Sequence, residues 1–262
     1  ALVAQVPHAI IVKTVMGNER GILYDGMHDD AFRGALLDVI ANRRVVKGLK
    51  GELRGTPREP FRGVLDAPLV METGLLNAGQ GNTTVIYNDK AVLKLFRRVE
   101  EGINPDVEMG DFLTNASFAH SPTILGDISY HERGSDRSNI AVLQCFVKND
   151  GDAWALCLRE VKRYYERRLL RKDLTEVTLP PHFMFSTKSS IPDLMVGLIG
   201  APFLDLIRLL GVRTGELHKT LMSGAGDPEF APESFNYLSL FALSQSMASY
   251  ARRTLQWAMN SK

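Results

Sequence analysis

The stretch that decides the fold is NAGQGNTTVIYNDKAVLKLFRR, residues 77–98. A polar loop with two glycines opens it, and two runs rich in β-branched, aromatic and leucine residues follow, separated by a short Asn-Asp turn. This order predicts a β-hairpin preceded by a glycine loop. The second run contains one lysine, Lys94, which shares a strand face with Val92 and Phe96 because side chains alternate along a strand. A partly buried ammonium group needs an anionic partner.

A helix with a suitable carboxylate is predicted shortly after Lys94. Asn104 suits the N-cap and Pro105 suits the first helical position. An apolar stripe follows at helical spacing, formed by Met109, Phe112, Leu113 and Ala116. Glu108 flanks this stripe, and a strand lysine that faces a helix glutamate is the ion pair of kinase-type nucleotide sites. We therefore predict that the Lys94 ammonium and the Glu108 carboxylate lie within salt-bridge reach, or within one water of it.

The glycine loop at residues 77–83 would place backbone N–H groups over nucleotide phosphates. Taken alone this loop is weak evidence, because glycines are common in hairpins, and a lone strand lysine is more often an exposed residue. The joint order is more informative: a glycine loop, a strand lysine, a helix glutamate and two further strands. That order favours a kinase-type nucleotide site over an ordinary hairpin.

The region before the loop predicts a mixed unit. Residues 8–24 indicate two strands joined by a Gly-Asn turn. Asp29 or Asp30 can cap a helix over residues 31–45. His28 and Asp30 also form an HxD string, but it precedes the glycine loop, so the aspartates are interpreted as helix caps. Residues 47–63 are basic and contain Gly and Pro, which predicts a loop or linker.

The rest of the chain predicts strands followed by helices. The expected strands lie at 68–76, 82–88, 91–97, 123–131 and 140–147. The expected helical segments lie at 152–173, 193–223 and 234–259, with a β-like run at 182–186 between them. Strands followed by helices indicate the α+β class. We divide the chain into a mixed unit over residues 1–66, a sheet unit over 67–150 and a helical region over 151–262.

Composition excludes few classes of function. The 262 residues are 45% hydrophobic and 23% charged, as in ordinary globular proteins, and a net charge of +1 gives no support for a nucleic-acid partner. Cys145 and Cys157 match no metal or disulfide pattern, which predicts reduced thiols and a cytoplasmic location. No apolar run approaches the ~20 residues of a membrane span, so no membrane partner is expected. The basic run at 158–173 predicts a solvated helix face, with an anionic partner as the alternative.

Longer blocks resemble the maltokinase family, the bacterial sugar kinases that are often fused to trehalose synthase. The blocks are LKLFRRVEEGINPDVEMGDFLT (93–114), FAHSPTILGDISY (118–130) and AVLQCFVKNDGDAW (141–154). Weaker similarity covers 21–44, 213–221 and 227–235. The resemblance implies a protein-kinase-like, aminoglycoside-phosphotransferase-like fold with a partial N-terminal cap, an antiparallel N-lobe and the beginning of a helical C-lobe. It also implies phosphorylation of maltose by ATP to maltose 1-phosphate.

The resemblance also implies roles for individual residues. It places the phosphate loop at Gln80, Gly81, Asn82 and Thr83. It makes Lys94 the phosphate lysine and Glu108 its helix partner. It places the adenine-facing hinge, which would contact the base mainly through backbone groups, at Gln144, Cys145, Phe146 and Val147.

Two departures from the family pattern qualify these implications. The loop reads AGQGN where the family more often has acidic and serine residues, and no HGD string of the catalytic loop occurs after residue 147. No catalytic residue or metal ligand is therefore assigned, and the ligands of Mg²⁺ are expected outside the chain. The sequence is interpreted as an internal fragment, inactive alone and prone to self-association. The alternatives are a nucleotide-binding module without catalysis and a docking domain for trehalose synthase.

Overall fold

The structure is a computed structural model that describes residues 6–65, 72–76, 82–171, 192–232 and 234–260. The chain divides into two compact units, Ala1–Glu216 and Leu217–Lys262. The first unit holds the sheet and most of the helices, and the second holds the end of α7 (Ala201–Met222) and α8 (Tyr237–Asn260). The β-like run predicted at residues 182–186 lies outside the described residues.

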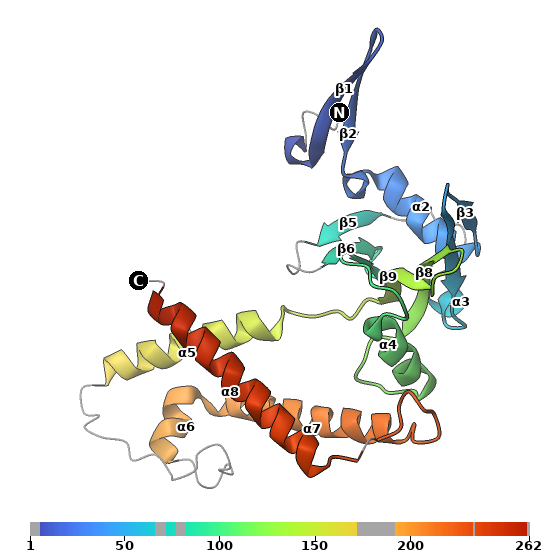
Figure 1. Cartoon of the computed structure of the whole chain (residues 1–262). Coiled ribbons are helices and arrows are strands. Elements are labelled where there is room, and N and C mark those ends of the chain that lie inside the picture. The colour runs from blue at the N-terminus through green and yellow to red at the C-terminus, as the bar shows by residue number, and fades with distance from the viewer. Residues whose placement is uncertain (1–5, 66–71, 77–81, 172–191, 233, 261–262) are drawn as a thin grey trace. The chain divides into compact units, whose positions relative to one another are not determined.

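The centre of the first unit is a seven-stranded antiparallel sheet in the order β3-β4-β8-β9-β7-β6-β5 (Figure 1). Its strands are β3 (Val45–Lys47), β4 (Gly51–Pro57), β5 (Thr73–Leu76), β6 (Asn82–Tyr87), β7 (Ala91–Phe96), β8 (Ile124–Glu132) and β9 (Ser138–Cys145). A separate hairpin precedes the sheet, formed by β1 (Ile10–Met16) and β2 (Glu19–Tyr24). Two short 3-10 helices, η1 (Pro7–Ala9) and η2 (Gly26–His28), flank the hairpin.

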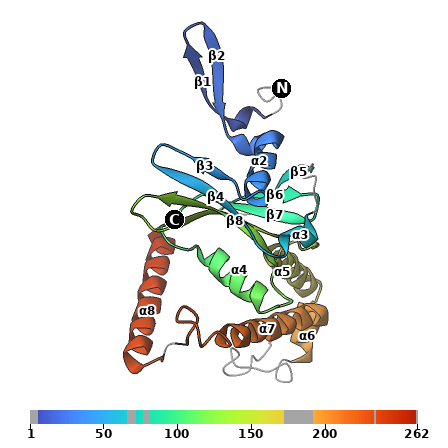
Figure 2. The same ribbon diagram turned by 90° about the vertical axis from the view of Figure 1, so that its right-hand side faces the viewer.

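Helices cover both faces of the sheet (Figure 2). On one face α2 (Asp30–Ala41) packs through Leu37 and Ile40 against Leu93 and Leu143, within the larger apolar core. On the other face α4 (Pro105–Asn115) contributes to a smaller core made of Phe96, Val107, Ile124 and Val142. The remaining helices are α3 (Phe61–Val64), α5 (Ala153–Leu170) and α6 (Asp193–Ile199).

The expected architecture is confirmed in the part of the chain that the structure describes. The strands predicted around residues 82–88, 91–97, 123–131 and 140–147 form one antiparallel sheet, and the predicted hairpin and helices around it are present. The glycine loop joins β5 to β6, which are paired strands. A lysine on the next strand, then a helix and two further strands, complete a kinase-like arrangement in an α+β fold.

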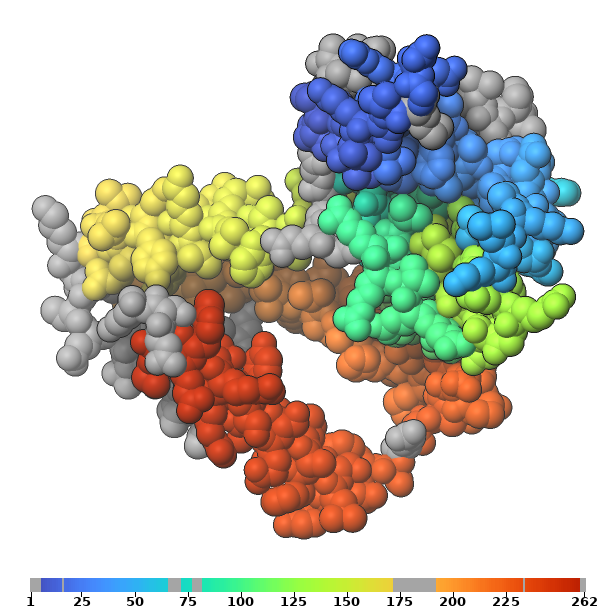
Figure 3. All heavy atoms as spheres, turned by 45° about the horizontal axis from the view of Figure 1, so that its top comes forward, coloured from blue at the N-terminus to red at the C-terminus, as the bar shows by residue number. Residues whose placement is uncertain are grey.

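The prediction of a linker over residues 47–63 was wrong, because β4 is a central strand of the sheet. β4 pairs with β8 along its whole length, from Gly51 opposite Glu132 to Pro57 opposite Gly126. Two glycines of this segment, Gly51 and Gly55, mark close backbone approaches instead. A side chain at Gly55 would overlap the backbone of Val39 in α2. In Figure 3 the atoms of this light blue segment lie directly against those of the green sheet strands.

Two helix predictions also need correction. The buried face of α4 is formed by Val107, Gly110 and Leu113, whereas the predicted stripe began at Met109, which is 39% exposed. Gly110 belongs to this face because its lack of a side chain lets α4 approach Ile124. The helix predicted over residues 193–223 is divided at Gly200, whose φ of +97° suits glycine, into α6 and α7.

The described helices differ from membrane spans in length or composition. Taken singly, none of these helices is both long enough and apolar enough to cross a membrane. The pair α6 and α7 satisfies the criterion of length and composition only when both are counted together, and they are bent by 89° at their junction.

Gly55→Ala is expected to lower the free energy of unfolding by about 3 kcal/mol, the upper part of the usual range for overpacking. The added methyl group would meet the backbone of α2 at Val39 and Ile40, which no rotamer change can move. Gly63→Ala is the matched control, because nothing lies within 4 Å of the added atom there. Urea unfolding followed by circular dichroism compares the two variants. Equal midpoints for both would show that the close approach of β4 and α2 is not needed.

Candidate functional site

Lys94 lies on β7, on the face that α4 covers. Its neighbours across the adjoining strands are Thr84 on β6 and Val142 on β9. The side chain is 34% exposed, and its ammonium lies 3.6 Å from Oδ2 of Asp106. The predicted face of the sheet and the predicted partial burial of Lys94 are therefore confirmed.

Helix α4 begins where its sequence predicts and presents one acidic side chain, that of Asp106, to the lysine strand. The Asn104 side chain accepts a hydrogen bond of 2.9 Å from the N–H of Asp106, and Pro105 occupies the first helical position. Asp106 and Glu108 both lie in the first turn, where the helix dipole favours negative charge. The local sequence thus explains why a carboxylate reaches the Lys94 ammonium.

The carboxylate that pairs with Lys94 differs from the predicted one. The structure brings Asp106 to the ammonium, not Glu108, among the residues that it describes. Two positions along a helix differ by about 200° in direction, so Asp106 and Glu108 cannot face the same neighbour. The predicted Lys94–Glu108 pair is therefore corrected to Lys94–Asp106, and a role of Glu108 in nucleotide binding stays a prediction.

The phosphate loop is described only in part. Gln80 and Gly81 lie outside the described residues. Asn82 and Thr83 open β6, opposite Phe96 and Leu95 of the lysine strand. The Thr83 hydroxyl also accepts a hydrogen bond of 3.3 Å from Nε of Arg97. The strand that leaves the glycine loop thus runs directly beside the strand that carries Lys94.

The predicted hinge begins in the last two residues of β9, Gln144 and Cys145, and continues to Phe146 and Val147. The N–H of Cys145 donates to the carbonyl of Thr123 and that of Phe146 donates to the carbonyl of Lys90, both at 2.9 Å. Val147 is 56% exposed, and its N–H has no hydrogen-bond partner among the residues that the structure describes. Val147 is thus the hinge residue with a backbone donor to offer a ligand. Burial raises the pKa of the Cys145 thiol, which keeps it protonated.

A group of charged and polar side chains that connects α4 with strands β8 and β9 was missed by the sequence analysis. We call it the Asp127 cluster, and its members are Arg58, Asp111, Asp127, Arg137 and Asn139. Asp127 is 0% exposed and accepts hydrogen bonds of 2.8–2.9 Å from the other cluster members except Asp111. Asp111, on α4, accepts two from Arg58, at 2.9 and 2.6 Å. An aspartate in the middle of an apolar predicted strand was the signal available in the sequence.

The Arg58 guanidinium is held between two carboxylates. Its hydrogen bond to Asp111 raises its pKa most, the negative charges of Asp111 and Asp127 raise it further, and burial opposes them. A buried carboxylate needs such charge-assisted bonds to remain ionised. Arg58 therefore stays protonated at neutral pH.

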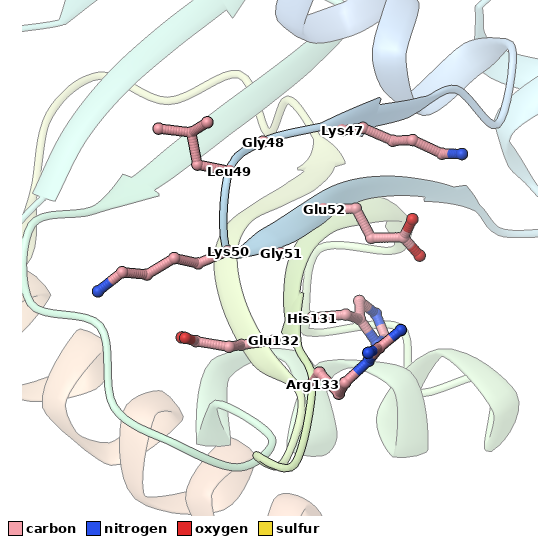
Figure 4. Close-up of a pocket in the computed structure, with 9 residues that line it drawn as sticks. All are labelled: Lys47, Gly48, Leu49, Lys50, Gly51, Glu52, His131, Glu132 and Arg133. Atoms are coloured by element: carbon pink, nitrogen blue, oxygen red, sulfur yellow. The ribbon is translucent and has the colours of Figure 1, made fainter.

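A hollow of about 700 Å³ lies at another part of the sheet, between the β3–β4 turn and the β8–β9 turn (Figure 4). Its charged lining residues are Lys47, Lys50, Glu52, Glu132 and Arg133, and His131 also lines it. Figure 4 shows that Lys50 and Glu132 extend to one side while Lys47, Glu52 and Arg133 extend to the other. Because each side carries both a cation and a carboxylate, the hollow presents no surface of a single charge, and its lining includes none of the residues around Lys94.

No magnesium site is assigned among the residues that the structure describes. Among them no group of three His, Cys, Asp or Glu side chains could hold a metal ion. Mg²⁺ is usually bound through carboxylates together with substrate phosphates. Lys94 and Asp106 form an ion pair instead, so no step through a metal is derived for this chain.

Comparison with known proteins gives partial matches. No protein-family model matches the chain. A glucosamine kinase structure (crystal form B) is similar over 60% of this chain and 37% of its own, with 18% identity and a TM-score of 0.34. A glucosamine kinase in complex with glucosamine, ADP and inorganic phosphate is similar over 47% and 39%, with 14% identity and a TM-score of 0.28. The chain thus spans less than half the length of these proteins, and at such TM-scores the assignment of the site rests on the topology of its own sheet.

Proposed function

We propose that this chain is the nucleotide-binding part of an ATP-dependent sugar kinase. The observation that carries the proposal is the position of Lys94. It lies on the strand after the glycine-loop hairpin, half-buried on the face of α4 and paired with an acid of that helix. A lysine in this position holds the α- and β-phosphates of ATP in kinases.

The roles proposed for the other residues come from the sequence resemblance. The backbone N–H groups of the loop at Gln80 and Gly81 and the start of β6 at Asn82 and Thr83 would contact the phosphates. Val147, with its exposed N–H, would contact the adenine base. Asp106 would hold the lysine in the direction of the phosphates.

The sugar and the setting are proposed from the sequence resemblance alone. Blocks 93–114, 118–130 and 141–154 support a maltokinase, which transfers the γ-phosphoryl group of ATP to the anomeric hydroxyl of maltose. The partner would be a trehalose synthase, and the location cytoplasmic. The lack of an HGD string after residue 147 supports a second candidate, a nucleotide-binding module without catalysis that docks to a trehalose synthase.

The 262 residues alone are expected to make no maltose 1-phosphate. Phosphoryl transfer requires a base or metal-held groups that bring the acceptor hydroxyl in line, and neither is assigned in this chain. A coupled ADP-release assay with maltose, ATP and Mg²⁺ tests this, with a heat-denatured sample as the blank. Maltose-dependent turnover above about 1 s⁻¹, an ordinary kinase rate, would contradict the expected inactivity.

A further inference from the structure

The Asp127 cluster does more than neutralise one buried carboxylate, because it also ties α4 to the sheet. Asp127 on β8 reaches the start of α4 through Asn139, whose Nδ2 donates to Asp127 and whose Oδ1 accepts the N–H of Asn104, both at 2.9 Å. It reaches the middle of α4 through Arg58, which donates to Asp127 and to Asp111. One buried carboxylate thus fixes the helix at two points.

These two ties bracket the acid that pairs with Lys94. Asp106 lies between Asn104 and Asp111 in the sequence, within the first turn of α4. The Lys94–Asp106 pair itself is weakly held, because the two side chains are 34% and 51% exposed and 3.6 Å apart. Its geometry therefore depends on where the helix is placed, and the helix is placed by the Asp127 cluster.

The cluster also includes a residue that precedes the glycine loop in the sequence, Arg58. Arg58 follows β4 directly, and its backbone N–H donates to the carbonyl of Leu125 at 2.8 Å. Its side chain is 23% exposed, and the guanidinium binds Asp111 through two parallel hydrogen bonds, a geometry that fixes orientation as well as distance. A segment far before the glycine loop thus takes part in holding the helix beside Lys94.

We propose that Asp111, Asp127 and Arg58 are positioning residues, which set α4 so that its first turn holds the Lys94 ammonium in place. The proposal rests on the proposed function for its consequence, the presentation of Lys94 to phosphate. It concerns the residues of this chain alone and needs neither metal nor sugar. Asp127 is buried, so its replacement can unfold the protein. Asp111 is 30% exposed, so its replacement should be less destabilising and is the better test.

The test uses Asp111→Asn in the full 262-residue chain, with lysines labelled as ¹³C-dimethylamines and observed by NMR. Lys94→Arg identifies the Lys94 signal, and Asp106→Asn gives its position when the ion pair is broken. Amide hydrogen exchange is measured on the same samples. Asp38→Asn is the matched control, because Asp38 is an aspartate of α2 paired with Arg44.

We expect Asp111→Asn to move the Lys94 signal toward its position in Asp106→Asn. Amides of residues 107–115 should exchange at least tenfold faster while those of residues 33–41 keep their rates. Asp111→Glu, which can still bind Arg58, should restore most of both effects. Asp38→Asn should leave the Lys94 signal unchanged.

An unchanged Lys94 signal in folded Asp111→Asn would overturn the proposal, since a merely structural tie would change stability and not the environment of Lys94. Two other results would likewise overturn the proposal: amide exchange that is accelerated equally in α2 and α4, or loss of folding in both Asp111→Asn and Arg58→Lys. Either would mean that the cluster only contributes to the overall stability of the protein. Addition of ATP to the wild type separates the two claims. If the Lys94 signal does not move when ATP is added but moves in Asp111→Asn, the nucleotide site is refuted while the positioning role is still supported.

Discussion

Asp127→Asn is expected to lower the free energy of unfolding by about 3–5 kcal/mol, the usual cost of removing one partner from a buried ion pair. Asp127 is 0% exposed, and two guanidinium groups and an amide donate to it. Asparagine has nearly the same shape but lacks the charge, and its own N–H groups would face those donors. Arg58 and Arg137 would be left without their buried counter-charge.

Urea unfolding followed by circular dichroism measures this effect. Asp89→Asn is the control, because Asp89 lies in the exposed β6–β7 turn with a φ of +53°, which asparagine also tolerates. Its free energy of unfolding should change by no more than about 0.5 kcal/mol. A loss below about 1 kcal/mol in Asp127→Asn would mean that the cluster contributes little to the stability of the sheet.

Lys94→Ala is expected to have the opposite profile, a small effect on stability and a large one on nucleotide binding. The Lys94–Asp106 pair is partly exposed, so its loss should cost at most about 1 kcal/mol. A hydrogen bond between a charged group and a phosphate contributes about 1.5–3 kcal/mol, which corresponds to a roughly 10- to 150-fold weaker affinity for ATP. In a longer protein that also supplied the catalytic groups, turnover should fall by orders of magnitude.

The control for this variant lies on the same hairpin. Lys90 is exposed in the turn before β7, and its backbone carbonyl, which Phe146 uses, is unaffected by a change of side chain. Lys90→Ala should bind ATP as the wild type does. Equal losses of affinity in Lys90→Ala and Lys94→Ala would indicate a general charge effect rather than a specific site.

Local signals in the sequence were sufficient for the elements around the site. Asn104 and Pro105 fixed the start of α4, Asp29 fixed the start of α2, and the alternation around Lys94 fixed its face. Each of these features depends on residues within a few positions of one another. Such short-range preferences can be recognised in the sequence alone.

The features that the sequence did not reveal depend on distant contacts. Gly55 looked like a linker residue because the helix backbone that it approaches lies elsewhere in the chain. Gly110 was not counted as part of an apolar stripe, although it forms the closest approach of α4 to Ile124. Arg58 and Asp127 are 69 positions apart, and no spacing rule connects them. The choice of Asp106 over Glu108 likewise depends on the rotation of α4, which the Asp127 cluster sets.

The central claim is that Lys94 binds the phosphates of a nucleotide, and an ATP titration observed at the Lys94 side chain tests it most directly. The chain carries ¹³C-dimethylated lysines, and the Lys94 signal is followed up to millimolar ATP, where weak binding still saturates. We predict that this signal moves along a saturable curve while that of Lys90 stays in place. A Lys94 signal that does not move, or that moves no more than the signals of exposed lysines, would contradict the assignment of this chain as the nucleotide-binding part of a kinase.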